Sequence, residues 1–165
     1  MNPDTPVKTF RIAPFAVSLL ITLGIGIVAS LFTRPEIATW YSKLNKPSFT
    51  PPNWLFPVAW TTLYVMIAIA AYIVWQHRDR TVRFVNTRVI YIAQLLLNFS
   101  WSIVFFGMHQ ILAALVVIVL LLILIALNIR WFGSYSRTAA WLLVPYLLWV
   151  SYATALNLSI YILNK

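Results

Sequence analysis

Four long stretches of this sequence contain no Asp, Glu, Lys or Arg and are dominated by apolar residues: 12–33, 53–76, 89–129 and 138–164. A helix needs about 20 apolar residues to cross the hydrocarbon core of a bilayer. The third stretch is too long for one crossing and contains a natural break at 107–110, Gly-Met-His-Gln. We therefore predict an all-α membrane protein, a single five-helix transmembrane bundle with spans at about 12–33, 53–76, 89–106, 111–129 and 138–164.

The composition supports this assignment and narrows the possible functions. The chain is 62% hydrophobic and 9% charged, whereas soluble domains carry roughly 25% charged residues. It has no cysteine, which excludes disulfides, thiolate zinc sites and iron–sulfur clusters. The net charge of +9 comes from basic residues between apolar runs, so we expect a lipid bilayer as partner and no nucleic acid.

The basic residues also predict an orientation. Five crossings put the termini on opposite sides of the membrane, and cytoplasmic loops are enriched in Lys and Arg. The side of the N-terminus would hold Lys8, Arg11, Arg78, Arg80, Arg83, Arg88, Arg130 and Arg137, and the other side Arg34, Lys43, Lys46 and Lys165. We therefore expect a multi-pass protein of a bacterial cell (inner) membrane, with its N-terminus in the cytoplasm.

Small residues recur at every fourth position of the first span: Ser18, Thr22, Gly26 and Ser30. They share one helical face and permit close approach of another backbone. Two interpretations stay open, packing inside the bundle or the seam of a homodimer.

Polar groups inside the spans indicate what chemistry is available. Asp4, Glu36 and Asp79 all lie outside the runs, so paired acids and activated nucleophiles are missing at depth. We expect no metal site and no required cofactor. His77 and His109 fall in loops on opposite predicted sides and cannot jointly ligate a haem.

Aromatic and amide side chains instead share helical faces. Gln94, Asn98 and Trp101 lie on one face of the third span, and Trp149, Ala153 and Asn157 on one face of the fifth. Trp60 and Tyr64 are one turn apart in the second. Such faces can line a cavity for a flat, mostly apolar ligand, or they can fill a packed core.

The first loop carries the most distinctive motif, WYSKLNKPSFTPPNWLFPVAW at 40–60. Together with QLLLNFSW at 94–101 and WLLVPYLLWVSYATALN at 141–157, it resembles the translocator protein family, also called tryptophan-rich sensory proteins or peripheral benzodiazepine receptors. The similarity runs from about residue 24 to residue 157, in the correct order.

The resemblance implies a five-helix bundle, usually dimeric, that binds porphyrins such as protoporphyrin IX and haem. It implies that the first loop is a stiff lid over the ligand cavity, and Lys43 and Lys46 are close enough in sequence to meet the propionates of a tetrapyrrole. The implied lid residues are Trp40, Lys43, Lys46, Pro47 and Pro52, and the implied ligand-binding residues are Tyr41, Pro51, Trp60, Tyr64, Asn98, Trp101, Trp149, Ala153 and Leu156.

Two departures from the family pattern matter. Ala113 stands where many relatives have Trp, and Leu158 stands where the animal cholesterol motif places Tyr. The second weakens the case for sterol binding.

Three functions stay open on the sequence. The first is a receptor or sensor that binds porphyrins and related hydrophobic ligands, with transport as an extension of binding. The second is light- and oxygen-dependent porphyrin degradation, with Trp60 and Trp149 as the catalytic participants. The third is a scaffold with a filled core.

Overall fold

All regular secondary structure in residues 9–78 and 81–165, the part of the chain that this computed structural model describes, is helical. Five helices are long and apolar enough to cross a membrane. Backbone N–H and C=O groups have no water partners in lipid, so a run this apolar satisfies them within a helix. The elements are α1 (Ile12–Ala38), the 3-10 turn η1 (Tyr41–Lys43), α2 (Leu55–Gln76), α3 (Val82–Ser102), the π-helical segment η2 (Ile103–Gly107), α4 (Ile111–Gly133) and α5 (Arg137–Leu163).

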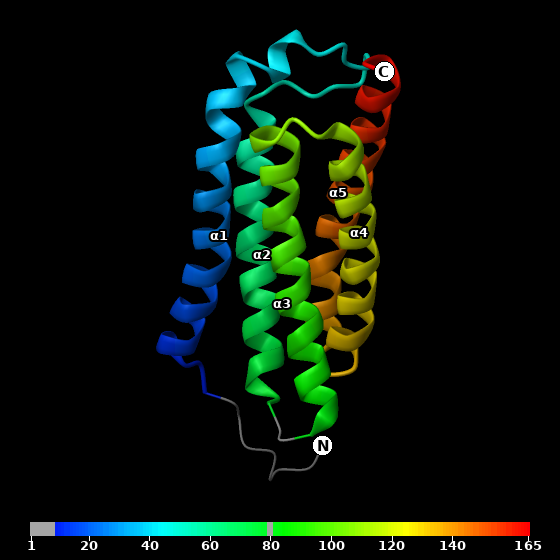
Figure 1. Ribbon diagram of the computed structural model, residues 1–165. Coiled ribbons are helices and arrows are strands. Elements are labelled where there is room, and N and C mark those ends of the chain that lie inside the picture. Colours follow the sequence, from blue (N-terminus) through cyan, green and yellow to red (C-terminus); the bar gives the residue numbers. More distant parts are fainter. Residues whose placement is uncertain (1–8, 79–80) are drawn as a thin grey trace.

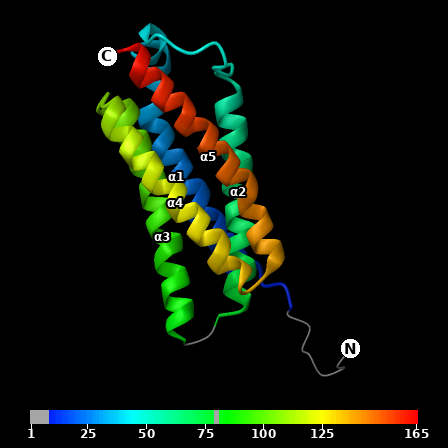
Figure 2. The ribbon, with the colours of Figure 1, turned by 90° about the vertical axis from the view of Figure 1, so that its right-hand side faces the viewer.

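The helices form a closed ring in the order α1, α2, α5, α4, α3. Each packs against its neighbour in that order, and α3 with η2 returns to α1. They run side by side along a common axis, and the first loop crosses the end of the bundle where α5 finishes (Figures 1 and 2). That end is called the loop end below.

Several helices extend beyond the charge-free runs that define the predicted spans. α1 continues through Arg34 and Pro35 to Ala38, and α3 begins at Val82, seven residues before the charge-free run. A charge near the membrane surface ends an apolar run but does not disfavour a helix, because Arg is a good helix former. Span boundaries that are set at the nearest charged residue therefore predict where the chain enters and leaves the membrane. They do not predict where the helix begins and ends.

The end of α3 changes from α-helical to π-helical geometry. Met108 N donates to Ile103 O at 2.8 Å, a bond across five residues, and the wider turn accommodates one extra residue. Two consecutive side chains, Phe105 and Phe106, are both buried as a result. The turn to α4 then passes through His109, which has a φ of 56°.

The packed core lies among α2, α3, α4 and α5. Its members are large and apolar, and several are fully inaccessible to solvent. They include Ile67, Leu95, Ile118, Leu121, Ile125, Phe132, Leu143, Tyr146 and Val150. α1 contributes no residue to this buried cluster.

Candidate functional site

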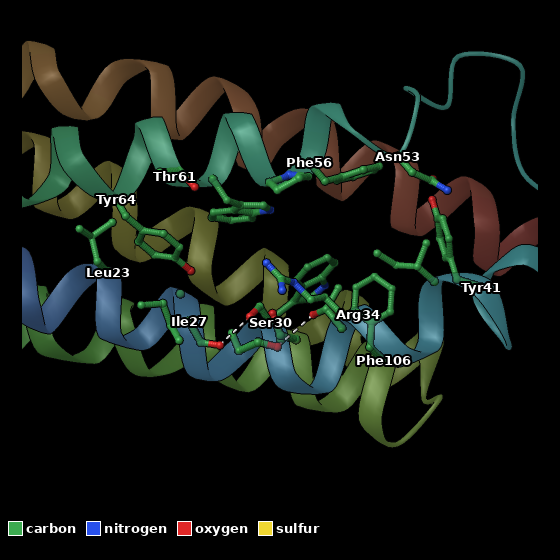
Figure 3. A pocket seen from close by; sticks show the side chains of 18 residues that line it. Leu23, Ile27, Ser30, Arg34, Tyr41, Asn53, Phe56, Thr61, Tyr64 and Phe106 are labelled. Carbon is green, nitrogen blue, oxygen red and sulfur yellow. Dashed lines mark hydrogen bonds between the residues drawn. The ribbon is translucent and has the colours of Figure 1, made fainter.

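A cavity of about 430 Å³ lies between α1, α2 and the far end of α3. Its volume is within the range of about 300–1,000 Å³ that is usual for small-molecule sites. Figure 3 shows Tyr64 and Leu23 toward one end, Tyr41 and Asn53 toward the loop end, and Phe56 and Thr61 along the α2 side. The lining residues are Leu23, Gly26, Ile27, Ala29, Ser30, Thr33, Arg34, Ile37, Tyr41, Asn53, Phe56, Pro57, Trp60, Thr61, Tyr64, Trp101, Ser102 and Phe106.

Aromatic rings form much of the cavity wall, and neighbouring groups hold them in place. The rings of Trp60 and Tyr64 stack with centroids 5.6 Å apart. Trp101 stacks on Phe105 at 5.4 Å and donates its indole N–H to Asn157 Oδ1 at 3.1 Å. Fixed rings offer a flat ligand a surface that loses little entropy on binding.

Tyr64 connects the cavity to a buried chain of hydrogen bonds. Its hydroxyl donates to Asn98 Oδ1 at 2.6 Å, and Asn98 Nδ2 donates to the Tyr146 hydroxyl at 3.0 Å. The Tyr146 hydroxyl in turn donates to Gln94 Oε1 at 3.0 Å. Asn98 therefore supports Tyr64 from behind and does not itself line the cavity.

The close approach of α1 to α2 requires a glycine at position 26. A Cβ there would lie 2.5 Å from Cε2 of Tyr64, whereas a Cβ at Gly24 would meet nothing within 4 Å. The other small residues at this four-residue spacing in α1 also face the interior of the bundle. Ser18 Oγ donates to Ala68 O at 2.9 Å, Thr22 is fully buried, and Ser30 lines the cavity. The arrangement matches packing inside the bundle, and the homodimer stays a prediction.

The structure divides the predicted ligand-binding set between three places. Tyr41, Trp60, Tyr64 and Trp101 line the cavity. Trp149 and Pro51 line a separate, more open hollow between α2 and α5, together with Leu55, Pro145, Leu148 and Tyr152. Asn98, Ala153 and Leu156 are buried and line neither of these spaces. Of the two tryptophans named for photo-oxidation, Trp60 alone lines the cavity.

The first loop is anchored on two sides of the bundle. Trp40 stacks on His109 at 4.3 Å, and His109 Nε2 lies 3.1 Å from Glu36 Oε2. On the other side, Asn45 N donates to Asn164 Oδ1, while Asn164 Nδ2 donates to Asn45 O, both at 2.9 Å. Tyr152 on α5 adds a bond from its hydroxyl to Phe49 O at 2.6 Å.

Within the loop, the two lysines have different roles. Lys46 Nζ donates to the carbonyl oxygens of Tyr41, Leu44 and Ser42 at 2.8, 3.1 and 3.2 Å, and it lies 4.9 Å from the Tyr41 ring centroid. Its charge therefore stabilises the fold of the loop. Lys43 is exposed, and neither lysine lines the cavity. Pro47 accepts a bond from Thr50 N at 3.0 Å in a tight turn, and Pro52 accepts one from Leu55 N at 3.0 Å just before α2.

Two polar groups at the loop end of the cavity stand out. Arg34 extends from α1 toward the cavity (Figure 3), although no site role was predicted for it. A sequence signal was present, because Arg34 continues the four-residue spacing of Ser18, Thr22, Gly26 and Ser30. The Tyr41 hydroxyl is buried and has no hydrogen-bond partner. Burial, with a smaller repulsion from Tyr152, raises the pKa of Tyr41 to about 12.

Comparison with known proteins shows which family the chain belongs to. The model of the TspO/MBR family matches residues 16–163. The chain is 45% identical to the tryptophan-rich protein TspO of Archaeoglobus fulgidus, over 93% of this chain and 99% of that protein. It is 35% identical to the tryptophan-rich sensory protein of Cereibacter sphaeroides, over 89% of each, and 36% identical to the human translocator protein, over 94% of this chain and 88% of that one. With this coverage and five membrane-spanning helices, the chain is a multi-pass membrane protein that belongs to the TspO/MBR family.

Proposed function

We propose that this protein is a membrane receptor or sensor that binds porphyrins, such as protoporphyrin IX or haem, and related flat hydrophobic ligands. The observation that carries the proposal is the cavity of about 430 Å³ walled by Trp60, Tyr64 and Trp101. The names of the relatives, sensory protein and translocator protein, support a sensory or carrier role.

The cavity favours a planar ligand for a physical reason. Indole and phenol rings attract flat aromatic partners by stacking, at about 0.5–1.5 kcal/mol per pair beyond the burial of apolar area. Apart from Arg34 and Asn53, the remaining wall is aliphatic, aromatic or carries hydroxyl groups, and two of those hydroxyls already donate hydrogen bonds. Ser30 Oγ donates to Ile27 O at 2.7 Å, and Thr33 Oγ1 donates to Ala29 O at 3.1 Å. A ligand that is mostly apolar therefore suits most of this surface.

Binding is tested directly by titration. Protein reconstituted in lipid nanodiscs is titrated with protoporphyrin IX while tryptophan emission is recorded, with empty nanodiscs and nanodiscs that hold an unrelated five-helix protein as controls. We expect saturable quenching with a micromolar or lower Kd, which corresponds to a binding free energy on the order of −8 kcal/mol. Quenching that is linear with porphyrin concentration and equal for the unrelated protein would refute the proposal.

The proposed topology places the N-terminus in the cytoplasm of a bacterial cell and the loop end outside, following the excess of Lys and Arg on the N-terminal side. The chain has no cysteine, so single-cysteine variants report orientation cleanly. Ser42→Cys at the loop end should react with an impermeant maleimide in intact cells, and Ser134→Cys at the other end should not. Both serines are exposed. The opposite labelling pattern would reverse the orientation.

A further inference from the structure

Arg34 places a positive charge beside a cavity whose other lining residues are uncharged and mostly aromatic or aliphatic. It lies on α1, one turn before the helix ends at Ala38, and it is a lining residue of the cavity. An arginine side chain is always charged and carries five N–H donors in a flat fork that matches a carboxylate. Arg34 as a whole is exposed, so its guanidinium is accessible, and an anion bound beside the apolar wall would pair with it through charge-assisted hydrogen bonds.

Within residues 9–78 and 81–165, no carboxylate lies within ion-pair distance of Arg34. Glu36 is two residues away, but its Oε2 atom already accepts from Thr39 Oγ1 at 3.0 Å and lies 3.1 Å from His109 Nε2. The cationic group at the cavity therefore has no counter-charge in the described part of the protein.

The Tyr41 hydroxyl is a second group without a partner, and it lies farther toward the loop end than Arg34 does (Figure 3). The side chain is 5% exposed and lines the cavity, yet its oxygen has no partner. A buried hydroxyl without a hydrogen bond is unfavourable, and native structures contain few of them. Because the pKa of this tyrosine is raised to about 12, the hydroxyl keeps its proton at neutral pH and can donate it.

From these two groups we infer that the cavity recognises its ligand through a carboxylate, with Arg34 as the charged partner and the Tyr41 hydroxyl as a further donor. The inference rests on the proposed function and narrows its substrate class to flat, apolar molecules that carry an acid group at one end. It assigns to Arg34 the role that the sequence suggested for Lys43 and Lys46. Lys46 is engaged with backbone carbonyls, and Lys43 is exposed outside the cavity.

A simpler explanation for Arg34 makes a different prediction. A basic residue in the last turns of a helix interacts favourably with the helix dipole, and a long side chain can reach the membrane surface. An arginine with that role alone would not distinguish an acid ligand from its ester.

The experiment compares protoporphyrin IX with its dimethyl ester, which has the same ring system but no carboxylate. Both Kd values are measured by porphyrin emission for each variant in nanodiscs of zwitterionic lipid, and the quantity of interest is the ratio of the ester Kd to the acid Kd. Partitioning of the two probes into lipid is common to all variants, so it cancels when the ratios are compared. The variants are Arg34→Gln, Arg34→Lys, Tyr41→Phe and Lys43→Gln, with Arg130→Gln, an exposed arginine on α4, as the matched control.

We expect the wild type to prefer the acid, and Arg34→Gln to reduce that preference about tenfold, the size of effect expected for a charge-assisted hydrogen bond. Tyr41→Phe should reduce it about threefold, in the range of a neutral hydrogen bond. Arg34→Lys should keep most of it, and Arg130→Gln all of it. Melting temperatures near that of the wild type would show that the variants are folded.

An unchanged ratio in Arg34→Gln, or a loss in Lys43→Gln instead, would overturn the inference. A wild type that binds acid and ester equally well would also overturn it, but porphyrin binding itself would stand. If the wild type bound neither probe, the proposed function would fall, and the inference with it.

Discussion

The two sides of this bundle are built differently. On one side, α2, α4 and α5 meet through large buried residues, and α5 alone buries Leu143, Tyr146, Val150 and Ile160. On the other side, α1 buries only Thr22 and Ala29, and the cavity lies along it. The first side is a packed frame, and the second is a wall with few buried side chains.

The difference shows how the chain combines stability with a binding site. Dense packing supplies the dispersion contacts that hold membrane helices together, because lipid removes most of the hydrophobic contribution. A cavity gives up some of those contacts, so it is best tolerated beside the helix that contributes least to the core. Binding elements are commonly drawn from the less stable part of a structure, and α1 buries fewer side chains than α2, α3, α4 or α5 does.

The largest expected effect comes from truncating a buried side chain in the packed frame. Phe132 is 2% exposed and packs near Tyr91, with ring centroids 5.9 Å apart. Phe132→Ala should lower the free energy of unfolding by about 3–5 kcal/mol, as in other large-to-small core changes. The matched change on the wall is Ile27→Ala, at a residue that is 65% exposed, and it should cost less than about 0.5 kcal/mol. Denaturation in mixed micelles measures both, and equal losses would show that the two sides do not differ.

A second prediction uses two glycines of the same helix. Gly26→Ala forces the Tyr64 ring to move, because its new Cβ would lie 2.5 Å from that ring. It should weaken porphyrin binding about tenfold and destabilise the protein by about 1–3 kcal/mol, as overpacking does. Gly24→Ala meets nothing within 4 Å and should be neutral or slightly stabilising. Similar affinities in the two variants would mean that the Tyr64 wall is not part of the binding site.

A third prediction concerns the attachment of the loop to the wall. Glu36→Gln weakens the contact with His109 but leaves the stacking of His109 on Trp40. Because the pair is partly exposed, the cost should be below about 1 kcal/mol. Hydrogen exchange of the backbone amides in 40–46 should become a few times faster, while amides of the α5 core should keep their rates. Unchanged exchange in the loop would show that this contact does not help to anchor the loop.

The smallest effect concerns Tyr41 at high pH. Its pKa is raised to about 12 in the folded protein from an ordinary value of about 10. The unfolded chain therefore loses this proton first, and the corresponding stability is present below pH 10 and is lost as the pH rises toward 12. Tyr41→Phe should flatten part of the fall in melting temperature between pH 10 and 12. An identical pH profile for the variant and the wild type would contradict the burial of this hydroxyl.

The sequence predicted the all-helical, five-crossing architecture because charge-free runs of this length have few alternatives in a membrane. It predicted less well where the helices end, since α1 continues past Arg34 and a charge does not stop a helix. The π-helical turn at Ile103–Gly107 left no signal that we could interpret.

For the site, Trp60, Tyr64 and Trp101 were identified because helical spacing puts them on inward faces. The same spacing grouped Trp149 with Ala153, but it could not tell which neighbour that face of α5 meets. The ring order of the helices decides this, and it leaves Trp149 at the separate hollow between α2 and α5. Arg34 was counted as a loop charge because it follows an apolar run, although its spacing from Gly26 and Ser30 already placed it on the cavity face.

The central claim is that the ligand occupies the cavity beside α1 and not the separate hollow between α2 and α5. It is tested most directly by measuring the Kd of protoporphyrin IX, by porphyrin emission, for Trp60→Ala and Trp149→Ala side by side. Trp60→Ala should weaken binding by about 1–3 kcal/mol, the scale for a central aromatic contact, and Trp149→Ala should leave it within about 0.5 kcal/mol of the wild type. The reverse result, with Trp149→Ala impaired and Trp60→Ala unaffected, would contradict the account.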